Sequence, residues 1–189
     1  MICPQPQGYD YVEGSVRSPK GLCRPFDAAA DGTVFGNGGG LVVLKKSGDA
    51  IAAGNTVYAN IIGSAVNHDG ARKMNFAAPS PQGQADVITN ALRNAGLGAD
   101  ALSFVEAHGT GTVVGDAIEW SSMGQVLKTS KRNAPCLVGS IKGNIGHLDE
   151  AAGVAGFIKS CLSLSHALFP GTCHFRELNP RLRPDETSR

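Results

Sequence analysis

The stretch that decides the fold is VEAHGTGTVVGDAIE, residues 105–119. It opens as an apolar strand, places His108 where that strand ends, and runs through glycines and threonines into the acidic start of a helix. A histidine in this position can be a buried structural group, a neighbour of a phosphate-binding loop or one half of a catalytic pair. The rest of the chain has to decide among these three possibilities.

The composition is that of an ordinary globular domain without a strong charge preference. Of the 189 residues, 42% are hydrophobic, which is enough for a sizeable core, and the formal net charge is +1. No basic run marks a surface for nucleic acid or an anionic membrane. No apolar run approaches the ~20 residues needed to span a bilayer, and the start, MICPQPQGYD, has no signal-peptide pattern. We therefore expect a cytoplasmic protein that binds neither nucleic acid nor membranes.

The cysteines are odd in number and irregularly spaced. No C-x-x-C motif occurs, so the pattern predicts neither a disulfide framework nor a zinc site. We expect free thiols and no bound metal. The five are Cys3, Cys23, Cys136, Cys161 and Cys173.

The pattern of the chain changes near residue 80. Residues 1–32 form a proline-rich, irregular lead, and the apolar runs at 41–44 and 56–66 predict two adjacent, antiparallel strands. Beyond this point helices and strands alternate, and this β-α-β-α order predicts an α/β fold with a parallel sheet at its centre. The expected elements are a helix from about Pro81 that stops at Gly96 or Gly98, a strand at 102–107, a helix from Asp116 to about Leu127 with Asp116 and Glu119 as a capping box, a strand at 134–141, and a helix from about Leu148 to His166.

Two strand-loop-helix segments in this half carry a histidine in the loop. The second is GSIKGNIGH, residues 139–147, which holds Lys142 and His147. Because ligands bind at the carboxyl ends of parallel strands, His108 and His147 should face one crevice. His147 precedes a helix N-terminus, where a neutral imidazole is favoured and can donate a hydrogen bond to an oxygen that gains negative charge. Thr110 and Thr112 add two hydroxyls in a loop small enough to admit a polar, elongated arm.

Other interpretations are weaker. A single histidine near a strand end is commonly structural, but two in equivalent loops beside a lysine favour a catalytic pair. The glycines after His108 resemble a loosened dinucleotide-binding fingerprint, but the spacing is off by one and no acidic residue ends the next strand. No Walker loop occurs. Two groups of residues are interpreted structurally: the glycines at 36–40 as a strand bend or close backbone contact, and His68, His166 and His174 as loop, surface or helix-end residues.

The motifs HGTGT, residues 108–112, and NIGH, residues 144–147, resemble those of β-ketoacyl synthase (ketosynthase) domains of modular type I polyketide synthases and, more distantly, of fatty acid synthases. GLCRPFDAAADG, GSAVNHDG, APSPQGQADVI and HFRELNPRL are similar to further ketosynthase segments in the same order. The resemblance implies an incomplete thiolase-like α/β fold with αβαβα layers. Residues 1–78 would be the end of the N-terminal half, with an irregular lead and two strands, and residues 79–189 most of the C-terminal half.

The resemblance also implies an activity. In this family an acyl group on a cysteine condenses with a malonyl-type extender that loses CO2, so the enzyme is an acyltransferase. By this resemblance His108 and His147 are the catalytic histidines, Lys142 is the active-site lysine, and Thr110 and Thr112 contact the substrate arm. That arm is the phosphopantetheine of an acyl carrier protein, which brings the acyl and malonyl thioesters; no cofactor is bound directly. The intact domain is expected to be a homodimer.

The chain also departs from the family. No cysteine here matches the strand-turn-helix elbow that carries the family's nucleophile, and the C-terminal glycine-rich loop is missing. The usual Pro-Leu after HGTGT is Val113-Val114, and the usual Pro before Ile118 is Ala117. We therefore expect a partial domain that is inactive as an isolated chain. The alternative is a catalytically inactive remnant or an interaction fragment of a ketosynthase.

Overall fold

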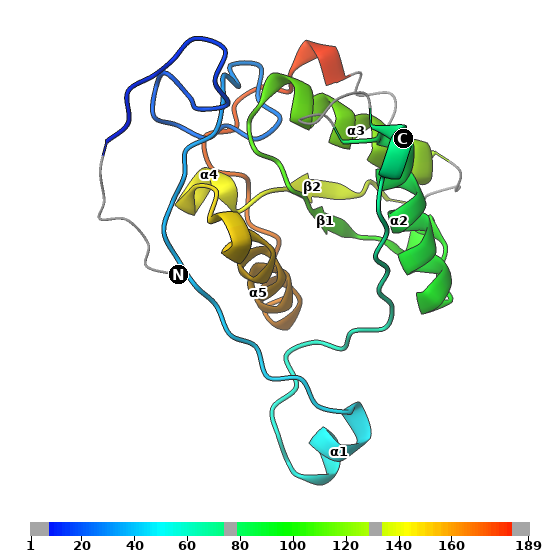
Figure 1. Cartoon of the computed structure of the whole chain (residues 1–189). Coiled ribbons are helices and arrows are strands. Elements are labelled where there is room, and N and C mark those ends of the chain that lie inside the picture. Colours follow the sequence, from blue (N-terminus) through cyan, green and yellow to red (C-terminus); the bar gives the residue numbers. More distant parts are fainter. Residues whose placement is uncertain (1–7, 74–78, 129–133, 183–189) are drawn as a thin grey trace.

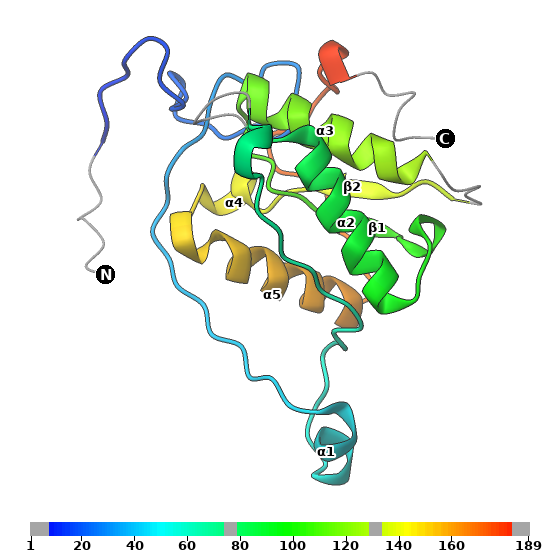
Figure 2. The ribbon, with the colours of Figure 1, turned by 45° about the vertical axis from the view of Figure 1, so that its right-hand side comes forward.

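Two short parallel strands lie between layers of helices (Figure 1). A computed structural model describes residues 8–73, 79–128 and 134–182. Strand β1 (Phe104–Glu106) pairs with β2 (Leu137–Gly139), with Val105 opposite Val138. Helices α2 (Pro81–Ala95) and α3 (Val113–Leu127) cover one face of the pair, and α5 (Ala152–Ser165) covers the other (Figure 2). This arrangement confirms the predicted alternation and the parallel pairing.

Helix α2 begins and ends as its sequence predicts. The Ser80 hydroxyl accepts a hydrogen bond from the Gly83 amide at 3.1 Å, and Pro81 occupies the first turn. Gly96 ends the helix in the left-handed conformation with φ 68°, which a residue with a Cβ rarely adopts. These local signals fix the helix independently of the rest of the fold.

Helix α3 starts three residues before the predicted position. Its N-cap is Thr112, so Asp116 and Glu119 lie inside the helix and do not form the expected capping box. Their carboxylates instead bind backbone amides outside the helix. The remaining helical segments are short: α1 (Ser47–Ala52), α4 (Lys142–Ile145) and the 3-10 turns η1 (Gly70–Arg72), η2 (Ala99–Ala101), η3 (Asp149–Ala151) and η4 (Pro180–Leu182).

The main core lies between the sheet and the helices α2 and α3. Its centre is the contact of Phe26 with Trp120, whose ring centroids are 5.7 Å apart. Phe26 belongs to the irregular lead, so the lead is anchored in the core of the C-terminal part. The other buried members are Ala85, Ala99, Ala107, Met123, Val126, Leu127, Cys136 and Leu182.

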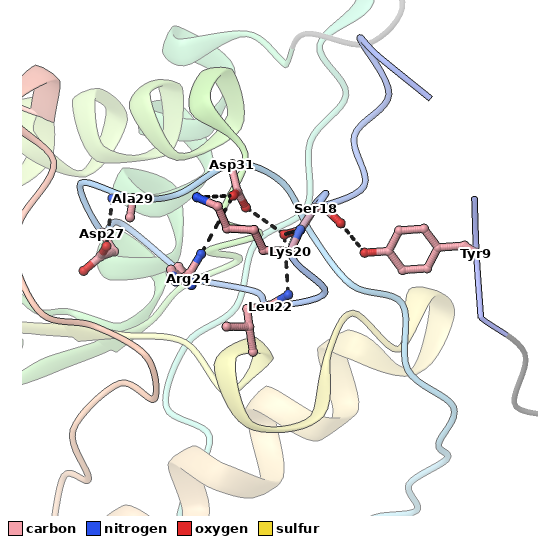
Figure 3. Close-up of polar contacts among 8 residues, drawn as sticks. All are labelled: Tyr9, Ser18, Lys20, Leu22, Arg24, Asp27, Ala29 and Asp31. Carbon is pink, nitrogen blue, oxygen red and sulfur yellow. Dashed lines mark hydrogen bonds and ion pairs between the residues drawn. The ribbon is translucent and has the colours of Figure 1, made fainter. Parts of the chain in front are cut away.

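Polar contacts hold the lead in one conformation (Figure 3). The Ser18 hydroxyl donates to Asp31 at 2.7 Å and accepts from the Lys20 amide at 3.2 Å. Asp31 also pairs with Lys20 at 3.2 Å and with Arg24 at 3.8 Å. Further along, the Asp27 carboxylate accepts the amides of 176 and 177 at 2.7 and 3.1 Å, which ties the lead to the end of the described chain.

The two strands expected at 41–44 and 56–66 are not formed, so that prediction is wrong. Figure 1 shows these segments as an excursion away from the helical layers, with α1 at its tip. A strand needs the extended backbone of another strand to pair with, and within the described residues the sheet consists of β1 and β2 alone. We call residues 41–66 the apolar arm because many of its large apolar side chains are exposed: Leu41, Val43, Leu44, Ile51, Val57, Tyr58, Ile61, Ile62 and Val66.

None of the helices in the described ranges combines the length and the apolar character needed to cross a bilayer.

Candidate active site

His108 and His147 lie side by side at the carboxyl ends of the two strands. His108 follows β1, and His147 follows α4, the short helix after β2. Their ring centroids are 5.1 Å apart, and the rings meet edge to face at 85°. Lys142, the first residue of α4, is buried beside them, and its charge acts on both imidazoles. The structure thus brings together three side chains that the sequence singled out.

His147 is held in one orientation by its neighbours. Its Nδ1 accepts the Asp149 amide at 3.0 Å, so a neutral ring carries its proton on Nε2. The Phe35 ring stacks on it with centroids 5.6 Å apart. Its backbone donates to the Val34 carbonyl at 2.7 Å and accepts from the Gly36 amide at 3.1 Å. His147 is therefore fixed as a hydrogen-bond donor through Nε2.

Close packing explains three of the glycines at 36–40, namely Gly36, Gly38 and Gly40. A Cβ at Gly36 would lie 2.1 Å from the Ile145 carbonyl oxygen, and one at Gly38 would lie 2.8 Å from Leu148. On the other side of the contact, a Cβ at Gly146 would lie 2.7 Å from the Val34 oxygen. The interpretation as a close backbone contact is confirmed for Gly36, whereas Gly38 faces the side chain of Leu148. The effect of the backbone contact is to press the 34–36 segment against the loop that carries His147.

Two carboxylates of α3 hold the loop that carries His108. Glu119 accepts the amides of His108 and Gly109 at 2.6 and 2.8 Å. Asp116 accepts the amides of Gly111 and Phe26 at 3.0 and 2.7 Å. The sequence interpretation missed this role because the same spacing fits a capping box. Residues three apart lie on one face of a helix, so the spacing of Asp116 and Glu119 was the available signal that both carboxylates face the same loop.

The small residues after His108 are required by packing. A Cβ at Gly109, where φ is 42°, would lie 2.6 Å from Ser140, and a Cβ at Gly111 would lie 3.0 Å from the Gly32 oxygen. The hydroxyls of Thr110 and Thr112 are 2.9 Å apart and share a hydrogen bond. The loop therefore packs closely between the lead and Ser140, which follows β2, with both hydroxyls together at the start of α3.

The surroundings favour neutral imidazoles. Burial, together with the smaller effects of Lys142 and His147 in the same direction, lowers the pKa of His108 to about 4. Burial, followed by the charge of Lys142, also lowers the pKa of His147. Both rings are therefore neutral at pH 7 and can each donate one N–H.

Lys142 lies among acidic groups. Burial lowers the pKa of its ammonium, while Glu119, Cys23 and Glu106 act against this shift. Burial in turn raises the pKa of Asp116 to about 6 despite the amides that it accepts. The site thus combines a buried cation with two uncharged donors, an arrangement suited to an oxygen that becomes negative.

A buried thiol also lies close to this site. Cys23 Sγ donates to the Thr110 carbonyl at 3.3 Å, and burial raises the pKa of this thiol, which disfavours the nucleophilic thiolate. Cys23, Cys161 and Cys173 are free thiols, whereas Cys3 lies outside the described residues. Among the residues that the structure describes, no three His, Cys, Asp or Glu side chains are grouped to hold a metal ion.

The other histidines lie elsewhere. His68 Nδ1 accepts the Gly70 amide at 2.9 Å in the loop before α2, and His166 is the C-cap of α5. His174 follows that helix in an irregular segment, with φ 63°.

Two family models match the chain. The model described as "Beta-ketoacyl synthase, C-terminal domain" matches residues 58–176. The model described as "Beta-ketoacyl synthase, N-terminal domain" matches residues 1–50.

Similar proteins and structures extend this result. A phenolphthiocerol/phthiocerol polyketide synthase of Mycobacterium tuberculosis is 50% identical over 189 residues, which are 99% of this chain and 13% of that protein. Ketosynthase twelve of the bacillaene polyketide synthase from Bacillus amyloliquefaciens matches with a TM-score of 0.88 at 38% identity, over 98% of this chain and 33% of that one. An oxazolomycin ketosynthase domain from Streptomyces albus matches with a TM-score of 0.88 at 37% identity, over 93% of this chain and 30% of that one. The chain therefore spans a small part of the curated relative and about a third of these solved chains.

Proposed function

Because the chain belongs to the β-ketoacyl synthase family, we propose that it supplies the decarboxylation centre of a condensing enzyme in polyketide biosynthesis. Its fold is the thiolase-like α/β fold of ketosynthase domains, of which this chain holds a part. The proposal assigns His108 and His147 as hydrogen-bond donors to the substrate. Lys142 stabilises the same region electrostatically.

The observation that carries the proposal is the paired arrangement of two neutral imidazoles. Their ring centroids are 5.1 Å apart, and His147 is committed to donate through Nε2. A substrate oxygen placed between the rings can receive one N–H from each. Donors fixed in this way stabilise a charge that develops only in the transition state, and each is worth roughly 10²- to 10³-fold in rate.

The proposed reaction has two steps. In a malonyl-type thioester the bond between the α-carbon and the carboxylate breaks, CO2 leaves, and the electron pair forms an enolate whose oxygen faces His108 and His147. The enolate carbon then attacks the carbonyl of an acyl group held on a cysteine of the intact domain. The new carbon–carbon bond forms, the carbon–sulfur bond breaks, and the cysteine leaves as a thiolate.

The substrates reach the site on a carrier. We assign the hydroxyls of Thr110 and Thr112 as contacts for the phosphopantetheine arm of an acyl carrier protein, since both lie at the start of α3 beside the histidine loop. The arm is the substrate carrier and not a resident cofactor. The partners are then the acyl carrier protein and a second copy of the intact domain.

A second candidate function is an inactive remnant or interaction fragment. The exposed side chains of the apolar arm favour it, because they offer a surface for association. A fusion that completes the domain with the corresponding segments of the Mycobacterium tuberculosis synthase separates the two. The enzyme proposal expects a β-ketoacyl thioester from acyl and malonyl carrier substrates; a folded, dimeric fusion that forms none would favour the remnant.

A further inference from the structure

A largely buried ion pair lies at the end of β1, two residues before His108. Glu106, the last residue of β1, meets Lys159 of α5 with Oε2 and Nζ 2.6 Å apart, and their side chains are 8% and 12% exposed. The ammonium also lies 5.3 Å from the centre of the Phe169 ring. Desolvation offsets much of the attraction in such a pair, so a buried ion pair is weak evidence for a stabilising role. The contacts of the second carboxylate oxygen of Glu106 indicate another role.

The second oxygen binds the loop that leads into α4. Glu106 Oε1 accepts the Ile141 amide at 2.7 Å. Ile141 is the N-cap of α4, so the next residue is Lys142, and the chain continues to His147. Glu106 itself stands two positions before His108. One carboxylate thus connects the strand that ends at one histidine with the loop that carries the other.

Helix α5 restricts the position of the Glu106 carboxylate. A Cβ at Gly156 of α5 would lie 3.2 Å from Glu106 Cγ, so the helix approaches the side chain closely. Phe169, which flanks Lys159, packs against Phe104 of β1 with centroids 4.8 Å apart. The carboxylate is therefore held between α5 and the amide of Ile141.

We propose that Glu106 is a positioning residue that sets the distance between His108 and His147 by fixing the Ile141 amide, while Lys159 neutralises and orients its carboxylate. This inference adds a positioning residue to the proposed active site. Its consequence for catalysis rests on the proposed function. The geometric part stands apart from catalysis, since it concerns the placement of α4 against β1.

Two double variants of the full chain separate positioning from simple stabilisation. Both E106L/K159M and E106Q/K159M remove the ion pair and leave the net charge unchanged. Only the glutamine retains an oxygen that can accept the Ile141 amide. If the pair serves stability alone, the two variants should leave the histidines equally arranged, because apolar or neutral replacement of a buried ion pair is often tolerated.

The readouts are Ile141 amide exchange and the nuclear Overhauser effect between the His108 and His147 ring protons. The proposal expects E106L/K159M to speed Ile141 exchange by about 10-fold or more and to lose the ring contact, because the amide has no acceptor. E106Q/K159M should keep both. Asp86→Asn, which breaks the exposed Arg72–Asp86 pair of 2.7 Å, is the control and should change neither.

Trp120 fluorescence reports whether the core of each variant is intact, since Trp120 of α3 packs against Phe26 in that core. Equal ring contacts in the two double variants would overturn the proposal, and so would loss of the contact in a folded E106Q/K159M. Unfolding of both would assign the pair to the fold itself and reject a positioning role. None of these readouts depends on catalysis, so they can succeed or fail independently of the proposed reaction.

Discussion

The backbone amide of Asp149 donates to Nδ1 of His147 at 3.0 Å. This contact leaves Nε2 as the protonated nitrogen of the neutral ring, the one free to face a substrate. We expect nitrogen-detected NMR at pH 7 to show His147 with a proton on Nε2 and none on Nδ1. A proton found on Nδ1 would contradict the assigned donor.

The pH dependence of stability should report the environment of His108. Its pKa is about 4 in the folded chain against 6.5 ordinarily, so between these values the unfolded state binds a proton that the folded state does not. Its contribution therefore lowers stability as pH falls through this window. Asp116, whose pKa is raised to about 6, has the opposite sign: its contribution is present at low pH and is lost as pH rises through about 6.

Comparison with His108→Gln isolates the histidine, because Asp116 is present in both proteins. Urea unfolding at pH 7 and pH 5 should show a larger loss of stability for the unmodified chain than for the variant. Equal losses would mean that His108 is not shielded in the folded state.

The isolated chain should form no stable acyl-enzyme. Burial raises the pKa of Cys23, the cysteine that contacts the histidine loop, and this disfavours its thiolate. Intact-mass measurement after incubation with an acyl-pantetheine thioester should show no specific adduct. A stoichiometric adduct that one Cys→Ala change abolishes would identify a nucleophile that this account does not recognise.

The apolar arm should drive association of the isolated chain. Leu41 and Val43 are 83% and 86% exposed, and exposed apolar clusters of this kind seek a partner surface. Light scattering should show self-association that L41K/V43K reduces. Val12→Lys, which alters an exposed apolar residue of the lead, should leave it unchanged. A stable monomer before any substitution would show that the arm is covered in another way.

The sequence predicted the parts of the fold that local signals determine. Helix α2 begins at Pro81 and is terminated by Gly96, one of the two stops that the sequence offered, and the paired histidine loops indicated the side-by-side arrangement of His108 and His147. The role of Glu119 was missed because its spacing also fits a capping box, and the sequence does not specify which backbone amides the carboxylate accepts. The prediction of two strands in the apolar arm was wrong for a related reason. An apolar pattern indicates a strand, but a strand forms only where another strand is present to pair with it.

The central claim is that two neutral imidazoles stabilise the oxygen that becomes negative during decarboxylation. The most direct measurement is CO2 release from a malonyl thioester by the completed domain, compared with its His108→Ala, His147→Ala and double variants and with His68→Ala as control. We predict that each single variant loses at least about 10²-fold in kcat, as expected for one fixed donor, while the control keeps its rate. Decarboxylation by the double variant at the unmodified rate would contradict the claim and leave two structural histidines.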